Sequence, residues 1–234
     1  MYSYLLFDAD GTLFDFKKSE ASAFSRTFRL YGMSSPSDEV YARYHSINQS
    51  LWDALDRGEV TKDYLTIERF RRLFTEFDIG APAESFNRDY LRLLGEGDFL
   101  LDGAHGFIHA LRAARPDAYM AIITNGVAAT QLSRFRRSSI RDCFDSIFIS
   151  EEIGATKPDV RYFNGVLAGI PGYCEAYRRE TVVIGDSPAA DILGANNARL
   201  ASVWYNPEHR ENRTAAVPTY TASSYAEIER IINA

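Results

Sequence analysis

The stretch Tyr4-Leu-Leu-Phe-Asp8-Ala-Asp10-Gly-Thr12 places a short apolar segment directly before two carboxylates and a turn. Residues 4–8 show no helical spacing, so we expect a buried β-strand that ends at Asp8. Because Asp8 and Asp10 are two residues apart where this strand ends, both side chains can face the same side. The sequence therefore predicts a pair of acidic groups at the carboxyl end of the first strand.

A long helical region follows this strand. Between about residues 17 and 97, apolar residues recur three or four positions apart, and glycines interrupt the pattern. Thr61 is predicted to cap one helix, and Gly58 to end the helix before it. The four predicted helices carry Phe24 to Tyr31, Tyr44 to Leu55, Tyr64 to Phe77, and Pro82 to Leu94. This region predicts an all-helical insert.

After Gly97 the pattern alternates between strands and helices, as is typical of a parallel sheet. The predicted strands are Tyr4–Asp8, Tyr119–Thr124, Ser146–Ser150, Thr181–Gly185 and Ala201–Tyr205. The predicted helices are Ala104–Ala114, Val127–Ser138, Val160–Leu167, Pro188–Asn197 and one that begins at the capping box Ser224-Tyr-Ala-Glu227. We therefore predict a doubly wound, Rossmann-like α/β core formed by residues 1–16 and 98–234, interrupted by a helical domain of residues 17–97.

Composition narrows the range of partners. The chain has 234 residues and a net charge of −6, which argues against a nucleic-acid polymer or an anionic membrane as the main partner. No apolar run approaches the length of a membrane span. The N-terminal segment reaches Asp8 before the core of a signal peptide forms, and we expect Cys143 and Cys174 to be reduced thiols. These features predict a cytoplasmic protein.

Polar residues cluster where the predicted strands end, which is where open parallel sheets bind ligands. These segments are Asp8-Ala-Asp10-Gly-Thr12, Thr124-Asn125-Gly126, Lys157-Pro158 and Gly185-Asp186-Ser-Pro-Ala-Ala-Asp191. Singly they are weak signals: Asn-Gly is a common turn, most lysines are solvated, and an aspartate after glycine often caps a helix. Their placement at successive strand ends makes a joint coincidence improbable.

The carboxylates are suited to two kinds of chemistry. In the pair Asp8 and Asp10, like charges push the two pKa values apart, so one group can act as nucleophile and the other as general acid/base. A calcium loop also begins Asp-x-Asp, but it requires Gly and Glu where this chain has Leu13 and Ser19. A helix-capping pair stays open as the structural alternative. Asp186 and Asp191, five residues apart across a turn, can both approach one hard cation.

With these four segments in order, the sequence resembles the haloacid dehalogenase-like (HAD) phosphatases along its whole length. The helical insert resembles the cap domain that this family carries after its first strand. More narrowly, the chain is similar to the pyrimidine 5′-nucleotidase branch. The stretches that carry this similarity are Ile123-Thr-Asn-Gly126, Ile149-Ser-Glu-Glu-Ile-Gly154, Asp191-Ile-Leu-Gly194, Trp204-Tyr-Asn206 with His209-Arg-Glu211, and Asn48 to Trp52.

The resemblance implies roles for the residues of the four motifs. Asp8 would attack phosphorus to give an aspartyl phosphate, and Asp10 would protonate the leaving alcohol and then activate water. Thr124, the amide of Asn125 and Lys157 would hold the phosphate. Mg²⁺ would be bound by Asp8, Asp186 and the backbone carbonyl of Asp10, with Asp191 either binding the metal directly or orienting its water ligands.

The resemblance also implies a substrate class. The expected activity is hydrolysis of small phosphate monoesters. The expected substrate is a nucleoside 5′-monophosphate with a pyrimidine base. Alternatives within the superfamily are a phosphatase of sugar or glycolate phosphates and a phosphomutase. From another class, an inactive binding or regulatory protein of this fold stays possible, although every motif residue is present. Asn48 and Trp52 of the insert could contact the leaving group, while packing inside the cap is the favoured interpretation of Trp52.

Overall fold

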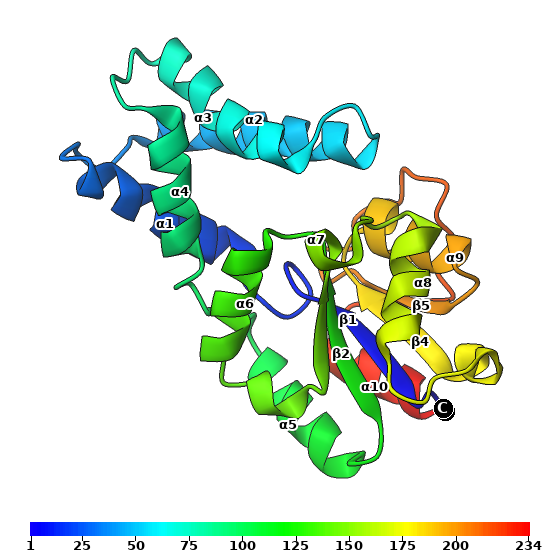
Figure 1. The fold of residues 1–234 in the computed structure, drawn as a ribbon. Helices are drawn as coiled ribbons and strands as arrows, with labels where there is room; N and C mark the ends of the chain where they lie inside the picture. Colours follow the sequence, from blue (N-terminus) through cyan, green and yellow to red (C-terminus); the bar gives the residue numbers. More distant parts are fainter.

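The computed structural model describes residues 1–234, with only the side chain of Asp56 outside the description. Its six strands form one parallel sheet in the order β3-β2-β1-β4-β5-β6 (Figure 1). The strands are β1 (Tyr4–Asp8), β2 (Tyr119–Thr124), β3 (Ser146–Ile149), β4 (Thr181–Gly185), β5 (Ala201–Tyr205) and β6 (Tyr220–Ala222). The strand order reverses on either side of β1, so the sheet is doubly wound, as the sequence predicted.

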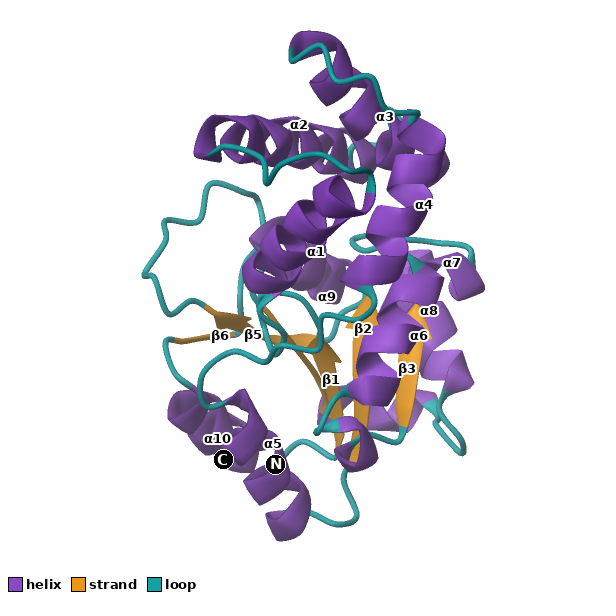
Figure 2. Ribbon diagram, turned by 90° about the vertical axis from the view of Figure 1, so that its left-hand side faces the viewer, coloured by secondary structure: helices purple, strands orange, loops and turns teal.

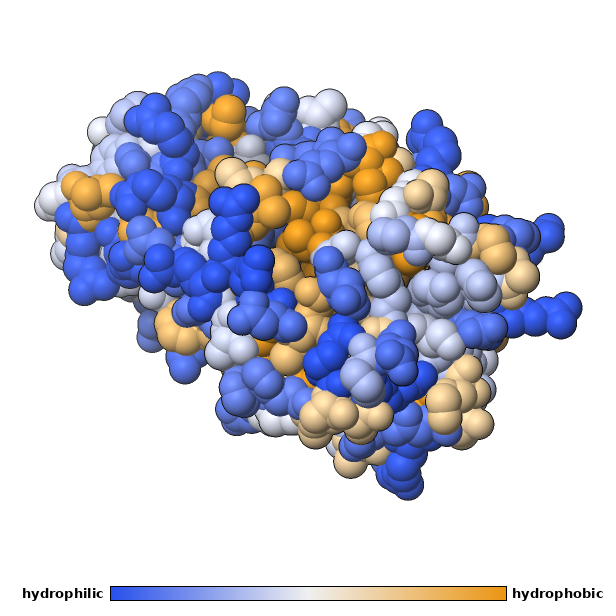
Figure 3. All heavy atoms as spheres, turned by 60° about the horizontal axis from the view of Figure 1, so that its bottom comes forward, coloured by the Kyte–Doolittle hydropathy of each residue, from blue (hydrophilic) through white to orange (hydrophobic). Residues whose placement is uncertain are grey.

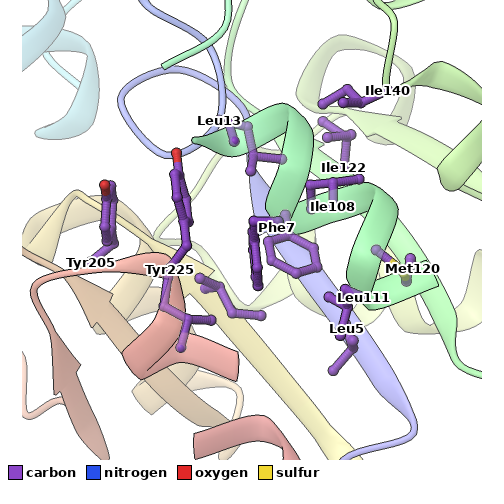
Figure 4. Close-up of a cluster of buried hydrophobic side chains, with 14 of the residues drawn as sticks. Leu5, Phe7, Leu13, Ile108, Leu111, Met120, Ile122, Ile140, Tyr205 and Tyr225 are labelled. Carbon is purple, nitrogen blue, oxygen red and sulfur yellow. The ribbon is translucent and has the colours of Figure 1, made fainter. Parts of the chain in front are cut away.

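Alternate residues of β1 enter different hydrophobic clusters, because successive side chains of a strand point to opposite faces. Leu5 and Phe7 pack with helices α5 and α10 on one face (Figure 4), whereas Leu6 packs with α8 and α9 on the other. These helices are α5 (Ala104–Ala114), α8 (Val160–Gly169), α9 (Leu193–Asn197) and α10 (Tyr225–Asn233). With both faces covered, β1 is held rigidly, and so is the position of Asp8 at its end.

The region between β1 and α5 is helical, as predicted. It contains α1 (Phe16–Leu30), α2 (Asp38–Asp56), α3 (Lys62–Glu76) and α4 (Ala83–Leu94). Asp15, Ser37 and Thr61 each accept a hydrogen bond from a backbone amide in the first turn of α1, α2 and α3, respectively. Such caps satisfy amides that have no partner within the helix. The cap at Thr61 confirms the expectation from the sequence, and α2 ends just before Gly58.

Helices α1–α4 have a hydrophobic cluster of their own, rich in aromatic rings. The ring of Tyr44 stacks on Phe24 at 4.5 Å and on Phe70 at 5.3 Å, measured between centroids. Phe86 of α4 lies against Phe70 at 4.9 Å. In Figure 2 this helical group lies above one end of the sheet, separate from the helices on the sheet faces. The exact division into domains at residues 17 and 97 stays a prediction.

Some local features differ from the expectations. The short edge strand β6 was not predicted, and β3 ends at Ile149 because Ser150 begins the helix α7 (Ser150–Ile153). The predicted helix over residues 188–197 begins as a π-helical segment, η3 (Pro188–Ile192), before α9. Three further elements are α6 (Ala128–Arg137) and the 3₁₀ helices η1 (Arg141–Cys143) and η2 (Glu175–Glu180).

The distribution of hydrophobic residues on the surface and the state of the two cysteines can be compared with the expectations from composition. On the face shown in Figure 3, hydrophilic residues surround a central patch of hydrophobic ones. Among the described residues, no helix has both the length and the apolar character that crossing a bilayer requires. Cys143 and Cys174 are free thiols, Cys143 buried and Cys174 exposed, as predicted.

Candidate active site

The four predicted motifs meet where β1, β2 and β4 end. Asp8 is the last residue of β1 and pairs in register with Ile123 of β2, next to Thr124. Asp186 follows directly after β4, and Lys157 lies in the segment between α7 and α8. The structure therefore brings Asp8, Thr124, Lys157 and Asp186 to one edge of the sheet, where they line a common cavity.

Lys157 bridges two carboxylates at the floor of this cavity. Its Nζ lies 2.6 Å from Oδ1 of Asp8 and 2.7 Å from Oδ1 of Asp191, and it also donates to the Ile123 carbonyl at 3.2 Å. Lys157, Asp8 and Asp191 are all buried. Although burial disfavours the charged lysine, the carboxylates of Asp191 and Asp8 raise the pKa of Lys157 above its usual value. Lys157 is therefore a cation at neutral pH.

The carboxylates of Asp8, Asp186 and Asp191 lie close together, with one oxygen from each within 4.8 Å of the others. Burial, followed by the charge of Asp191, raises the pKa of Asp8 well above its usual range, while Lys157 opposes this shift. The same two causes raise the pKa of Asp186 to about 6. Two cations lie beside these three acidic groups, because Arg210 lies 3.2 Å from Asp186 in addition to the contacts of Lys157. One negative charge is left over, and it favours a further cation.

The geometry around Asp186 fits a small divalent cation. All three carboxylates offer oxygen ligands, which Mg²⁺ prefers. The loop after β1 approaches Asp186 so closely that a Cβ on Gly11 would lie 2.8 Å from its carboxylate, and Gly11 has a φ of +88°. Both oxygens of Asp191 accept hydrogen bonds, one from Lys157 and one from the Ser187 amide at 3.0 Å. Asp8 and Asp186 are therefore better placed than Asp191 to bind a metal directly.

The loop after β2 is fixed by reciprocal hydrogen bonds. The side chain of Asn125 donates to the Lys157 carbonyl at 2.9 Å and accepts from the Lys157 amide at 2.8 Å. Oγ1 of Thr124 accepts from the Gly126 amide at 3.0 Å. Asn125 therefore ties the loop to the segment that carries Lys157, a structural task that the sequence did not reveal.

Asp10 lies at the same cavity but in a different environment from Asp8. One of its oxygens accepts from Arg134 at 2.6 Å, and the other accepts from Gln131 at 2.7 Å. Both partners belong to α6, and the sequence analysis did not identify them. A signal was present, because residues 131 and 134 are three apart on a helix that starts just after the Thr124-Asn125-Gly126 turn, so they share one face.

Helices α1–α4 supply the opposite wall of the cavity, whose volume is about 520 Å³. His45, Asn48, Trp52 and Arg69 line it together with the motif residues. Asn48 is buried, donates a hydrogen bond to Glu20 at 3.0 Å and accepts one from Arg69 at 3.1 Å. Both polar atoms of its side-chain amide are therefore hydrogen-bonded inside the helical group. Trp52 is partly buried against the aromatic cluster and also lines the cavity, so packing and ligand contact are both open to it.

One further residue joins the helical group to the loop after β2. Lys62, the first residue of α3, donates to the carbonyls of Asn125 at 2.6 Å and Gly126 at 3.1 Å. It also contacts Oγ of Ser150 at 2.9 Å and Glu151 at 3.1 Å. Burial lowers the pKa of Lys62, and Glu151 opposes the shift. No pattern in the sequence predicts this contact, because Lys62 and Asn125 are 63 positions apart.

The chain is similar to one known protein family and to several known proteins over nearly its full length. The family model described as haloacid dehalogenase-like hydrolase matches residues 2–199. YfnB of Bacillus subtilis (strain 168) is 38% identical over 99% of this chain and 96% of its own length. Two proteins named pyrimidine 5′-nucleotidase are similar over nearly their full lengths. They are PynA of Streptococcus pneumoniae (35% identity; 97% of this chain, 93% of PynA) and YjjG of Escherichia coli (33%; 99% and 98%).

Solved structures agree with this similarity. The crystal structure of YfnB from Bacillus subtilis bound to magnesium superposes with a TM-score of 0.90 at 36% identity, covering 100% of this chain and 99% of YfnB. The L-2-haloacid dehalogenase PA0810 superposes with a TM-score of 0.72 at 22% identity, covering 100% and 99% of the two chains. The second comparison concerns the fold alone.

Proposed function

The chain belongs to the haloacid dehalogenase-like hydrolase family, and on this basis we propose that it is a Mg²⁺-dependent phosphatase of pyrimidine nucleoside 5′-monophosphates. The observation that carries the proposal is the cluster of Asp8, Lys157, Asp186 and Asp191 at the strand ends, facing a cavity walled by helices. A volume of about 520 Å³ falls in the range of small-molecule sites, roughly 300–1,000 Å³. The similarity to two pyrimidine 5′-nucleotidases supports the substrate class.

In the proposed reaction, a carboxylate oxygen of Asp8 attacks phosphorus, and the electrons of the breaking P–O bond go to the leaving oxygen. Asp10 gives its proton to that oxygen, so the alcohol departs neutral. Water then attacks the aspartyl phosphate, its proton passes to Asp10, and the bond between phosphorus and Asp8 breaks. Phosphate is released, and both aspartates return to their starting forms.

Charge neutralisation is the other requirement of phosphoryl transfer. Lys157 lies 2.6 Å from the nucleophile, so its charge can act both on Asp8 and on a phosphate bound beside it. We assign Thr124 and the backbone amide of Asn125 to the phosphate oxygens, because the hydrogen bonds of that loop hold it rigidly at the cavity. These groups would bind the phosphate while Asp8 attacks.

Mg²⁺ would be held by Asp8, Asp186 and the backbone carbonyl of Asp10, with Asp191 orienting the ligands around it. When bound, it would supply positive charge to the phosphate oxygens. The helical group of residues 17–97 would be a cap that covers the leaving group and excludes water. The contacts of Lys62 with the loop after β2 support a closed position of this cap.

Mg²⁺ is expected to raise the melting temperature of the protein, because it would bind the folded state alone. The stabilisation should be about 2.7 kcal/mol at a Mg²⁺ concentration 100 times the dissociation constant. The Asp186→Ala variant should lose most of this shift and require more Mg²⁺ for activity. Asp142→Ala, at an aspartate that is 89% exposed, serves as the matched control and should keep the shift. Full activity in EDTA would contradict the metal assignment.

A panel of phosphorylated metabolites tests the substrate class. The kcat/KM values for pyrimidine nucleoside 5′-monophosphates should exceed those for purine nucleotides, sugar phosphates and phosphoglycolate. If sugar phosphates rank above every nucleotide, the nucleotidase proposal is wrong, although the phosphatase proposal stands. If none of these compounds releases phosphate in the presence of Mg²⁺, the chain is not a phosphatase of small monoesters.

The panel repeated with Trp52→Ala tests whether the cap selects the base. A lost stacking contact should reduce kcat/KM for the preferred nucleotide by an amount equivalent to about 1–3 kcal/mol. Activity on a small aryl phosphate should change much less. Phe77→Ala is the control, since Phe77 packs on the same aromatic cluster at the far end of α3. A large drop in melting temperature with unchanged nucleotide preference would assign Trp52 to packing alone.

A further inference from the structure

We infer that Arg134 and Gln131 are positioning residues for Asp10, and that they hold its carboxylate in the orientation that proton transfer requires. The inference rests on the proposed function, in which Asp10 serves both the leaving oxygen and the attacking water. It concerns two residues of α6 that lie outside the four motifs. Three observations carry it: the contacts of Arg134, the contact of Gln131, and the space that Gly126 leaves beside Gln131.

Arg134 is fixed from several sides. Its Nη1 lies 2.6 Å from Oδ1 of Asp10, and its Nε donates to the Gly97 carbonyl at 3.0 Å. The guanidinium lies over the ring of Phe14, 5.0 Å from the centroid. The side chain is 1% exposed, although it carries a permanent charge. A side chain fixed in this way has little freedom to turn, so it defines the place of one Asp10 oxygen.

Stability alone does not account for an arginine at this position. Burying a charge is costly, and replacing a buried ion pair with apolar residues of similar volume is often neutral or stabilising. Nη2 of Arg134 is buried and has no hydrogen-bond partner among the described residues, which adds to the cost. The arginine is therefore better explained by the directed hydrogen bond that it makes to Asp10.

Gln131 fixes the second oxygen of Asp10. Its Nε2 lies 2.7 Å from Oδ2 of Asp10, and the side chain is buried. Residue 126, in the turn after β2, is a glycine beside this side chain. A Cβ at that position would lie 2.2 Å from Nε2 of Gln131, the same atom that donates to Asp10. The turn thus leaves the space through which Gln131 reaches the carboxylate.

Two donors, one on each oxygen, fix the plane of the Asp10 carboxylate. A carboxylate has about four acceptor sites, so two stay open beside these donors. One of them can carry the proton that Asp10 gives to the leaving oxygen and later takes from water. Proton transfer needs a heavy-atom distance of about 2.6–3.2 Å, and a misplacement of about 1 Å can cost on the order of 100-fold in rate. Arg134 and Gln131 would therefore act on the rate through Asp10, without touching the substrate.

The test compares leaving groups that differ in their need for a proton. A nucleoside 5′-monophosphate releases a primary alcohol, which must be protonated, whereas p-nitrophenyl phosphate releases an acidic phenol, which need not be. Gln131→Met keeps the volume and removes the donor, and Arg134→Lys keeps the charge and shortens the reach. The single-turnover rate of nucleoside release should fall about 100-fold in Gln131→Met. The rate of phenol release should fall less than about 10-fold, with little change in KM for either substrate.

Arg134→Lys should lose less than Arg134→Met, because an ammonium can still donate to Asp10. Arg112→Met is the control for loss of a partly buried arginine. Arg112 pairs with Asp145 at a distance of 2.7 Å, and neither residue lines the cavity. This variant should lower the melting temperature without changing the ratio of the two rates. If Gln131→Met and Arg134→Lys slow both substrates equally or neither of them, the positioning role is wrong. If the wild-type protein releases neither nucleoside nor phenol in the presence of Mg²⁺, the proposed function fails instead.

Discussion

The Asp8→Asn variant is expected to lose phosphate release by a factor on the order of 10⁴–10⁶, the scale seen when a nucleophile is removed from an enzyme. An amide is a poor nucleophile and a weak ligand for Mg²⁺, so the change would affect both proposed roles of Asp8. It also removes the ion pair with Lys157, whose Nζ lies 2.6 Å away. Steady-state phosphate release from the preferred nucleotide, with saturating Mg²⁺, measures the loss.

Loss of folding should not account for this result. Lys157 keeps its ion pair with Asp191 at 2.7 Å in this variant, so its charge is not left unpaired. A neutral amide of the same shape also relieves the repulsion by Asp191 that, together with burial, raises the pKa of Asp8. The melting temperature in EDTA should therefore not fall. A chirally labelled phosphate tests the route independently. Two in-line displacements retain configuration at phosphorus, and net inversion would mean direct attack by water, with Asp8 losing the role of nucleophile.

Much of the core followed from the sequence because its strands are buried on both faces. Such strands appear as short apolar runs, and β1, β2, β4 and β5 lie where those runs predicted them. The edge strand β6 gave no such signal, because it has three residues and two of them are exposed. The helix predicted over residues 188–197 is present, but its first five residues form a π-helix, a type that the spacing of apolar residues did not indicate.

The same physical reason explains which site residues were predictable. Asp8, Thr124 and Asp186 lie at strand ends, and parallel strands bring their carboxyl ends to one edge, so the sequence could place them together. Arg134 and Lys62 escaped notice because their contacts depend on how helices pack. The rotation of α6 decides which of its faces meets Asp10, and the placement of α3 decides what Lys62 reaches. Neither quantity appears in a motif or in the spacing of apolar residues.

The Lys157→Met variant is expected to lose both stability and activity. Lys157 is the cation between Asp8 and Asp191, and removing one partner of a buried ion pair typically costs about 3–5 kcal/mol of unfolding free energy. Loss of one group that stabilises charge in the transition state typically costs about 10²–10³ in kcat. Denaturant unfolding in EDTA measures the first effect, and phosphate release with Mg²⁺ measures the second.

A double-mutant cycle with Asp191→Asn separates electrostatics from packing. If repulsion between Asp8 and Asp191 destabilises Lys157→Met, neutralising Asp191 should recover part of the lost free energy, with a coupling of about 0.5–3 kcal/mol. Mg²⁺ should also recover part of it, because a cation beside Asp8 and Asp186 offsets the same charge. If the changes in unfolding free energy of Lys157→Met and Asp191→Asn add within about 0.5 kcal/mol in the double variant, Lys157 stabilises the site by filling space. In that case repulsion among the carboxylates does not measurably destabilise the folded protein, and the electrostatic argument for a bound cation loses its basis.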